Sequence, residues 1–450
     1  MTVLAPTIDH AAPASASAPT TRRVLSHARD LPWIAVLPLS LVVPILDSNP
    51  LTAAHSLWAP LSLVMLVPAY RSLPRTRLRP LWLWMLGLAA VGIIGSAQLA
   101  GASLSEAVGP VMAVGSVVGT VYFVRAMALR GPRYLWTATA SIGVAMLVHT
   151  YQILPLAPDA AGNPWKFGIG YSVSIIVLSV CAAAGRTWLE VVSALVLAVV
   201  SFSEATRAMG VVLALAAGVL VIARIARDQP TFTRVGGRLC VGAVLGVTAL
   251  FGADALLNSE LFASSAERFA EQAEVNDNSL LAGRTEPPIS IAAISESPFV
   301  GMGPEPHPTN AIVDRAISVA EDLGYRQIDQ LVRWWTQDDT IYVHSVLADT
   351  WVRSGLPAAA LYIAALLCFV GTFVRGILGA AVRPALAIFA LAQSVWDVFF
   401  SPAAYGQLVL IGLAIGLCSV TIPKKAPGLP DGRVRETATG AVPDPLIGAR

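Results

Sequence analysis

Two arginines and one histidine, each next to an apolar segment, are the residues whose types and positions could do chemistry. Arg207 lies in the polar turn SEATRAMG, Arg284 in the segment GRTEPP, and His344 in YVHSVLAD. An ionisable residue at the edge of an apolar segment is often there for a charged partner. An imidazole can take a proton near neutral pH. These residue types therefore allow anion binding and proton transfer.

A structural role is the alternative for each of these residues. The Arg207 guanidinium could reach lipid headgroups or pair with Glu204, and Arg284 could be a solvated loop charge. His344 lies near an expected helix start, where a lone histidine often has a structural role. From the residues alone, both interpretations stay open.

Membrane-spanning helices are the elements that must position these residues. Hydrophobic residues make up 55% of the 450 residues and charged residues only 13%, whereas a soluble domain carries about a quarter charged residues. A helix needs about 20 mainly apolar residues to cross a hydrocarbon core of roughly 30 Å. The sequence predicts an all-α membrane protein with about 12 transmembrane helices. We expect them at 31–46, 52–70, 81–100, 107–127, 134–153, 168–185, 188–203, 208–225, 238–257, 355–374, 378–397 and 404–422.

The distribution of arginine predicts the orientation of these helices, because basic residues stay in short cytoplasmic loops. Arginine occurs in every second connection, although the sixth has Arg186 alone, and the tail begins with Lys424 and Lys425. The alternate connections carry few basic residues, which are Lys166 and Arg207. These connections are DSNP, GASLSEA, LPLAPDAAGNPWK and SFSEATR. We therefore expect both termini in the cytoplasm and the 258–354 segment on the outer face of the membrane.

The 258–354 segment is predicted to be a packed outer subdomain, partly helical, between the ninth and tenth spans. It holds 15 Asp and Glu residues against 6 Arg residues, a net charge of −9, which argues against nucleic-acid binding. Apolar residues at helical spacing predict two amphipathic helices. The first has Ile312, Ala316, Ile317 and Ala320 on one face, and the second has Ile328, Leu331, Val332 and Trp335.

The chain is therefore expected to have five regions. They are a disordered cytoplasmic segment at 1–30, transmembrane helices 1–9 at 31–257, the outer subdomain at 258–354, transmembrane helices 10–12 at 355–422, and a disordered cytoplasmic tail at 423–450.

Neither a metal nor a cofactor is predicted. The cysteines lie in apolar runs without Cys or His neighbours at metal-binding spacing. They are Cys181, Cys240, Cys368 and Cys418. Asp338 and Asp339 could bind a divalent ion together with His307 or His344, but no spacing in the sequence supports such a site.

The order of these motifs resembles the O-antigen ligase/polymerase (Wzy/WaaL-like) superfamily. The shared features are an arginine turn after a middle span, a long outer loop with an arginine and SPFVGMGPE, and a histidine ahead of LADTWVRSGLPAA. The resemblance covers about residues 195–375. The superfamily usually has Ser-Arg-Gly where this chain has Thr206-Arg207-Ala208, and His-Asn where it has His344-Ser345.

The resemblance implies an enzyme that moves a glycan from a polyprenyl diphosphate carrier to a hydroxyl of a glycan or lipid acceptor, without a metal. It implies that Arg207 and Arg284 bind the diphosphate, because guanidinium groups offer paired donors to phosphate oxygens and offset the charge on the leaving group. Arg353 and Arg315 are second candidates for this anion site. His344 would take the proton of the attacking hydroxyl, which gives inversion at the anomeric carbon.

Two other functions suit a polytopic membrane protein. Glycosyltransferases that use lipid monophosphate sugars carry catalytic carboxylates in a large first outer loop, but this loop is DSNP, in which Asp47 is the one acid. A transporter or flippase of lipid-linked glycans is the alternative, although transporters tend to have ionisable residues at mid-membrane and repeated halves. Ligase and polymerase differ in their acceptor, and both are open.

Overall fold

The described part of the chain is helical in the computed structural model. It comprises residues 36–42, 58–75, 78–153, 163–204, 206–225, 236, 275–276, 284–336, 340–378, 383–401 and 405–420. No strand occurs within these ranges, where Asn276 and Tyr325 form an isolated antiparallel bridge. The predicted all-α class is confirmed for these residues.

Most helices of the bundle lie where the apolar segments predict them. In chain order they are η1 (Leu37–Val42), α2 (Trp58–Ser72), α3 (Leu78–Leu99), α4 (Leu104–Arg130), α5 (Pro132–Ile153), the π-helical turn η4 (Trp165–Ile169), α7 (Gly170–Ala184), α8 (Thr187–Ser203), α9 (Arg207–Ile225), α15 (Val346–Leu378), α16 (Ala385–Phe400) and α17 (Tyr405–Cys418). The span expected at 238–257 lies outside the described residues, and the span at 31–46 is described only at 36–42.

Four helices in the described ranges are long and apolar enough to cross a membrane, at Arg79–Leu99, Leu104–Arg130, Arg207–Arg224 and Val346–Arg375. Four shorter apolar helices accompany them, at Gly170–Ala184, Thr187–Ser203, Ala385–Phe400 and Gly406–Cys418. The protein is therefore a multi-pass membrane protein. The number of about 12 spans stays a prediction.

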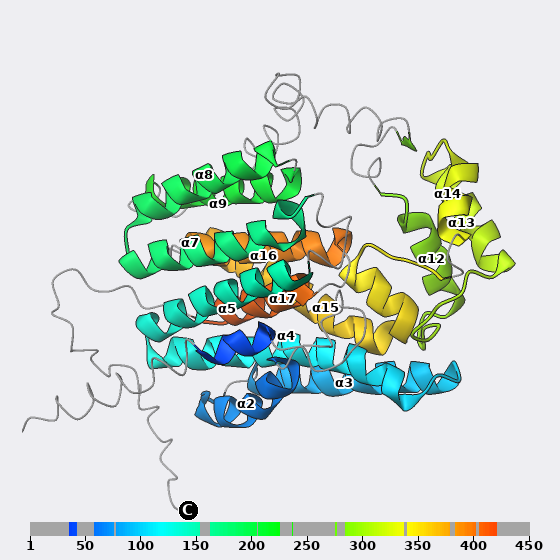
Figure 1. The fold of residues 1–450 in the computed structure, drawn as a ribbon, viewed down its shortest axis with the longest axis horizontal. Coiled ribbons are helices and arrows are strands. Elements are labelled where there is room, and N and C mark those ends of the chain that lie inside the picture. The colour runs from blue at the N-terminus through cyan, green and yellow to red at the C-terminus, as the bar shows by residue number, and fades with distance from the viewer. Residues whose placement is uncertain are drawn as a thin grey trace, which may run out of the picture. The chain divides into compact units, whose positions relative to one another are not determined.

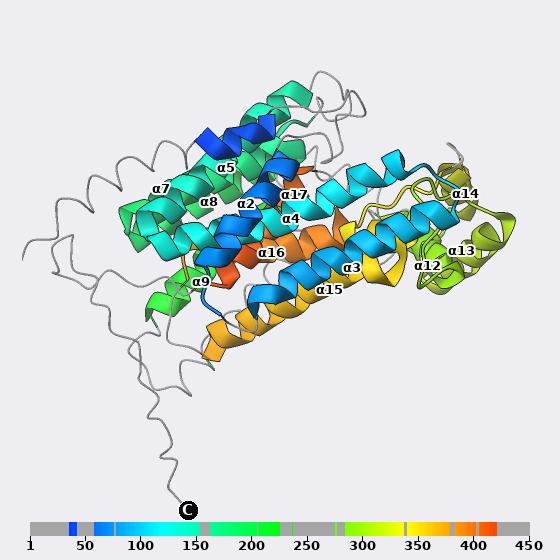
Figure 2. The ribbon, with the colours of Figure 1, turned by 90° about the horizontal axis from the view of Figure 1, so that it is seen from below.

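Helices that short connections join run in opposite directions, from α3 to α9 and again from α15 to α17. α3 packs against α15, α5 against α7, α17 against α4, and α8 against α9, and Figures 1 and 2 show these helices side by side. One end of the bundle carries arginines at the ends of its helices: Arg71, Arg79, Arg130, Arg133, Arg186, Arg224, Arg375 and Arg383. The opposite end, called the site end below, holds the beginnings of α7 and α9 and the ends of α8 and α16.

Three short helices pack together beside the bundle, at one end of it in both views (Figures 1 and 2). They are α12 (Pro287–Glu296), α13 (Asn310–Asp322) and α14 (Ile328–Thr336). Thr309 caps α13, because its side chain accepts a hydrogen bond from the backbone N–H of Ile312.

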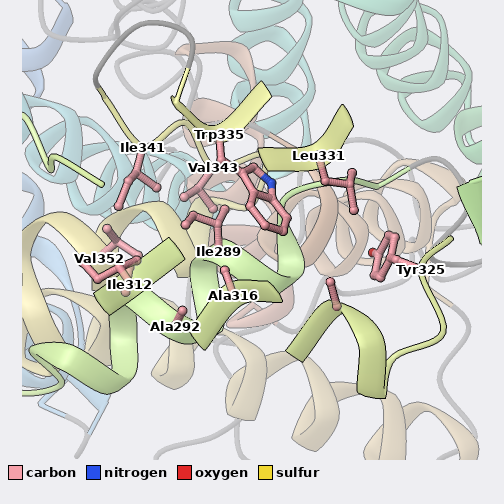
Figure 3. Packing of buried hydrophobic residues seen from close by; sticks show 12 residues of the cluster. Ile289, Ala292, Ile312, Ala316, Tyr325, Leu331, Trp335, Ile341, Val343 and Val352 are labelled. Carbon is pink, nitrogen blue, oxygen red and sulfur yellow. The ribbon is translucent and has the colours of Figure 1, made fainter. Parts of the chain in front are cut away.

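The three helices share one apolar core. Its buried side chains are Ile289, Ala292, Ala293, Ile312, Ala316, Ala320, Tyr325, Leu331, Trp335, Ile341, Val343 and Val352. Figure 3 shows Trp335 reaching in among Ile289 and Val343. Burying a large apolar side chain contributes about 1.5–3 kcal/mol relative to leaving it exposed. Both predicted amphipathic faces are confirmed, since Ile317, Ile328 and Val332 also pack against this core.

α15 connects this helical cluster to the bundle and is interrupted at Gly355, whose φ is 69° and ψ is −175°. The turn 297–304 lies against this interruption. Leu356 N donates to Pro298 O at 3.0 Å, and Gly303 N donates to Arg353 O at 2.9 Å. Ser96 of α3 donates to the same Arg353 carbonyl at 2.6 Å. The turn, α3 and the beginning of α15 are therefore held together.

Candidate functional site

Glu286 and His344 are in direct contact at the site end, although 58 positions separate them in the sequence. His344 Nδ1 lies 2.7 Å from Glu286 Oε1. The Glu286 side chain is 16% exposed and that of His344 is 49% exposed. Burial alone raises the pKa of Glu286, but the hydrogen bond and charge of His344, with a contribution from Arg284, bring that pKa below its ordinary value. The carboxylate is therefore ionised at neutral pH.

His344 lies just before α15, not on its helical face. Helical spacing predicts that His344 shares a face with Leu347 and Trp351, and this expectation is wrong because α15 begins at Val346. The Ser345 hydroxyl accepts a hydrogen bond from Ala348 N at 3.1 Å, so Ser345 caps the helix. It also donates to the Val398 carbonyl at 2.9 Å. This anchors the residue next to His344 to the end of α16.

Arg284 lies against the aromatic end of α16. Its guanidinium carbon is 5.9 Å from the ring centre of Trp396 and 5.6 Å from that of Phe400, which is within the range of cation–π contacts. Burial lowers the pKa of Arg284, whereas the negative charges of Glu286 and Asp397 raise it. Both effects leave a guanidinium charged at neutral pH. The prolines that follow Arg284 in GRTEPP predict that a short helix begins there, and this is confirmed, because α12 begins at Pro287.

The backbone around Arg284 is held by the core of the helical cluster. The Tyr325 hydroxyl donates to Arg284 O at 2.5 Å. The Trp335 indole N–H donates to Thr285 O at 2.8 Å. Burial raises the pKa of Tyr325, so the phenol keeps its proton for this bond. The segment that carries Arg284 and Glu286 is therefore fixed to the core shown in Figure 3.

Asp397 is fully buried near the end of α16, beside these residues. Its Oδ1 accepts hydrogen bonds from Ser401 Oγ at 2.7 Å, Gln393 Nε2 at 3.0 Å and the Tyr171 hydroxyl at 3.2 Å. Its Oδ2 has no hydrogen-bond partner among the described residues. A buried carboxylate oxygen without a hydrogen bond lowers the stability of the fold. A role for Asp397 beside Arg284 in the site explains why such an acid is present here.

Arg207 is the first residue of α9, at the same end of the bundle. The beginnings of α7 and α9 are in contact there, because a Cβ on Gly170 would overlap the Met209 side chain. Tyr171, the next residue of α7, donates to Asp397. α9 also packs against α16. Arg207 thus lies in the layer that contains Asp397. Glu286 contacts His344 directly, and its charge also acts on Arg284.

The two second candidates for anion binding have protein partners. Arg353 donates through Nε to Asp349 Oδ1 at 2.8 Å, and its NH1 donates to the Pro304 carbonyl. Arg315 on α13 donates to Ser295 Oγ at 2.7 Å and lies 3.6 Å from Glu296. Arg353 therefore holds the turn 297–304, and Arg315 lies on the exposed surface of the helical cluster.

The described residues contain no group of three or more His, Cys, Asp or Glu side chains that could hold a metal ion. The pair Asp338–Asp339 lies outside the described residues.

Two members of this site, Glu286 and Asp397, are absent from the sequence-based candidates. Glu286 stands two positions after Arg284, and Asp397 is a lone acid within an apolar run. Both signals are visible in the sequence, but only the packing of α12 and α16 shows which groups these acids contact. Together the residues provide a half-exposed base with an ionised partner and a guanidinium over aromatic rings. Such a site can take a proton from a hydroxyl and hold an anion.

Residues 171–363 match the family model Wzy_C, described as O-antigen ligase. This range includes Tyr171, Arg207, Arg284, Glu286 and His344. Comparison with curated proteins and with solved structures gives no match. The resemblance to the O-antigen ligase/polymerase superfamily is therefore confirmed over this segment.

Proposed function

We propose that this multi-pass bacterial membrane protein, with its O-antigen ligase domain, transfers or polymerises a glycan carried on a polyprenyl diphosphate. The acceptor is a hydroxyl of a second glycan or of a lipid, on the outer face of the inner membrane. The family match supports glycan transfer of the ligase/polymerase type. The donor, the acceptor and the residue roles are our proposals.

The observation that carries this function is the convergence of Arg284 and His344 at Glu286. In the proposed reaction, the acceptor hydroxyl gives its proton to Nε2 of His344 as its oxygen bonds to the anomeric carbon. The bond from that carbon to the diphosphate oxygen breaks, and its electron pair leaves with the phosphate. Attack opposite the leaving group inverts the anomeric carbon.

The charge that develops on the leaving diphosphate needs stabilisation by cations. Arg284 and Arg207 take this role in our proposal, because guanidinium groups remain charged and bind phosphate through paired donors. The carboxylates of Glu286 and Asp397 keep the local charge balanced before the donor arrives. The reaction proceeds without a metal ion in this scheme.

The arrangement of charges supports an outer location of the site. Arginines border the helices at the end of the bundle opposite the site, and basic residues favour the cytoplasmic side. We propose that the site end faces outward, that both termini are cytoplasmic, and that about 12 spans surround the site. The polyprenyl chain of the donor would lie along apolar helix surface.

Substitution in the native host tests this function. Arg207→Ala, Arg284→Ala and His344→Ala are each expected to abolish surface glycan and to accumulate lipid-linked units, at normal membrane levels of protein. Arg333→Ala is the matched control, since Arg333 is exposed and its Nε bonds the Asp329 carbonyl of its own helix. Unimpaired polymer in the His344 variant overturns the proposed base. Lipid-linked units confined to the cytoplasmic side of the membrane indicate a flippase instead.

A further inference from the structure

The contact between Glu286 and His344 differs from an ordinary surface ion pair. His344 Nδ1 and Glu286 Oε1 are 2.7 Å apart, and the Glu286 side chain is only 16% exposed. By comparison, Arg315 and Glu296 on the same helical cluster are 3.6 Å apart with both side chains 49% exposed. Exposed pairs of the second kind contribute little to stability. A partly desolvated carboxylate at hydrogen-bonding distance has a stronger effect on its partner.

The charge state of Glu286 determines which imidazole nitrogen carries the proton. Its pKa is lowered, after the opposing effect of burial, by His344, by its own backbone N–H and by Arg284. An ionised carboxylate can only accept hydrogen bonds. Nδ1 of His344 must therefore carry a hydrogen, and in the neutral ring the lone pair lies on Nε2. Glu286 thus selects the tautomer in which Nε2 is the base.

Hydrogen bonds hold the backbone next to both Glu286 and His344. The carbonyls of the two residues before Glu286 accept hydrogen bonds from Tyr325 and Trp335. The Glu286 carbonyl itself accepts from Ser290 N at 3.0 Å. On the other side, Ser345 bonds the Val398 carbonyl of α16. The imidazole is therefore held between the helical cluster and the bundle, and its rotation is restricted.

We propose that Glu286 is the positioning residue of His344, which fixes the Nδ1–H tautomer and directs Nε2 toward the acceptor hydroxyl. This inference rests on the proposed function for its catalytic consequence, but the tautomer itself is a property of the protein alone. Glu286 acts through the imidazole and does not touch the reacting atoms.

Glu286→Gln and Glu286→Asp test this role, with Glu296→Gln as the matched control. Glutamine keeps the shape but can turn its amide N–H toward Nδ1, which favours the wrong tautomer. Aspartate keeps the charge and shortens the reach by one methylene group. The first readout uses full-length protein labelled with ¹⁵N-histidine in lipid, in which nitrogen–proton correlations report the protonated ring nitrogen. The His344→Ala protein identifies the His344 signals.

The second readout is the initial rate of transfer of the host's own lipid-linked glycan in isolated membranes, at several donor concentrations. Glu286→Gln is expected to lower the maximal rate by about 10- to 100-fold, less than the roughly 10²- to 10⁴-fold that a general base contributes. The donor KM should not rise, because the positioning role affects proton transfer, and loss of the Glu286 charge near Arg284 removes a repulsion of the donor diphosphate. Glu286→Asp should recover part of the rate, and Glu296→Gln should match the wild type.

The two readouts separate the possible failures. An unchanged His344 tautomer in Glu286→Gln overturns the positioning role, even if the rate falls, because the loss is then structural. A wild-type rate in Glu286→Gln also overturns it. If His344→Ala keeps full activity while Glu286→Gln changes the tautomer, the proposed base fails and the inferred tautomer control stands.

Discussion

Gly355 of α15 and Phe299 of the turn 297–304 are packed backbone against backbone. A Cβ on Gly355 would overlap the carbonyl group of Phe299. The φ of Gly355, 69°, is also one that other L-residues rarely adopt. In the turn 297–304, a Cβ on Gly301, with φ of 82°, would lie 2.6 Å from the Arg353 carbonyl. Gly355 and Gly301 therefore allow the backbone of the turn 297–304 to pack directly against α15, the helix that follows His344.

The first prediction is that Gly355→Ala destabilises the protein and impairs transfer. The added methyl group would require the turn to move away, and the residue would keep a strained conformation that costs about 1–3 kcal/mol. We expect a lower unfolding temperature in detergent and reduced surface glycan at equal membrane levels. Gly371→Ala, in the same helix, is the control, because its Cβ would meet nothing closer than 4.0 Å. Equal stability of the two variants contradicts this account.

The second prediction concerns the bond that holds the backbone of Arg284. Tyr325→Phe removes the hydroxyl that donates to Arg284 O and leaves the ring in the core. We expect a loss of about 1 kcal/mol in unfolding free energy and a donor KM that rises several-fold, since the guanidinium is less well placed for diphosphate. The measurements are denaturant unfolding and transfer kinetics in membranes. A Tyr325→Phe protein with lower stability but unchanged KM shows that Arg284 does not need this support.

The third prediction follows from the lowered pKa of Glu286. Burial opposes the shift, while the His344 contact and Arg284 produce it. A carboxyl whose pKa is lower in the folded state contributes stability above its unfolded pKa of about 4.3, and this stability is lost as the pH falls through the folded pKa. We therefore expect wild-type protein to unfold at a higher temperature than Glu286→Gln at about pH 6, and the difference to shrink as the pH falls below about 4. A difference that stays constant or grows on acidification assigns the stability to another group.

Several features of the fold can be predicted from the sequence because they depend on local composition. The apolar run 188–203 gives α8 at Thr187–Ser203, and 134–153 gives α5 at Pro132–Ile153. The pair Pro287-Pro288 marks the beginning of α12 after Arg284, since proline is favoured in the first helical turn. Periodicity identifies the buried faces of α13 and α14.

The remaining features depend on contacts between distant segments. His344 is expected on a helical face, yet the helix begins after it, at Val346, because Ser345 caps the first turn and also donates to Val398 O, 53 positions away. The pairing of His344 with Glu286 requires α12 and α15 to meet, and no periodicity encodes that meeting. Asp397 looks like an acid at the end of a span until its contacts with Tyr171 and Ser401 are known. Local patterns locate helices, whereas partners of polar groups follow from packing.

The fourth prediction separates the charge of Asp397 from its hydrogen bonds. In Asp397→Asn the amide oxygen can still accept from Ser401, Gln393 and Tyr171, but the negative charge that acts on Arg284 is gone. In Asp397→Ala these donors lose their acceptor, which costs about 1–3 kcal/mol for each buried group left unsatisfied. We therefore expect the Asp397→Asn protein to be nearly as stable as the wild type and the Asp397→Ala protein to be clearly less stable.

The Asp397→Asn substitution is also expected to lower the donor KM. A carboxylate next to Arg284 competes with the donor diphosphate for the guanidinium and repels it, so removing the charge should strengthen donor binding. A change of about 1 kcal/mol, the size of a strongly screened interaction between two charges, corresponds to a donor KM about fivefold lower in Asp397→Asn. Transfer kinetics in membranes measure this, with Asp349→Asn as a control for loss of a carboxylate that pairs with Arg353 instead. A higher donor KM in Asp397→Asn means that the carboxylate holds Arg284 in place for the diphosphate, and that its orienting effect outweighs its repulsion.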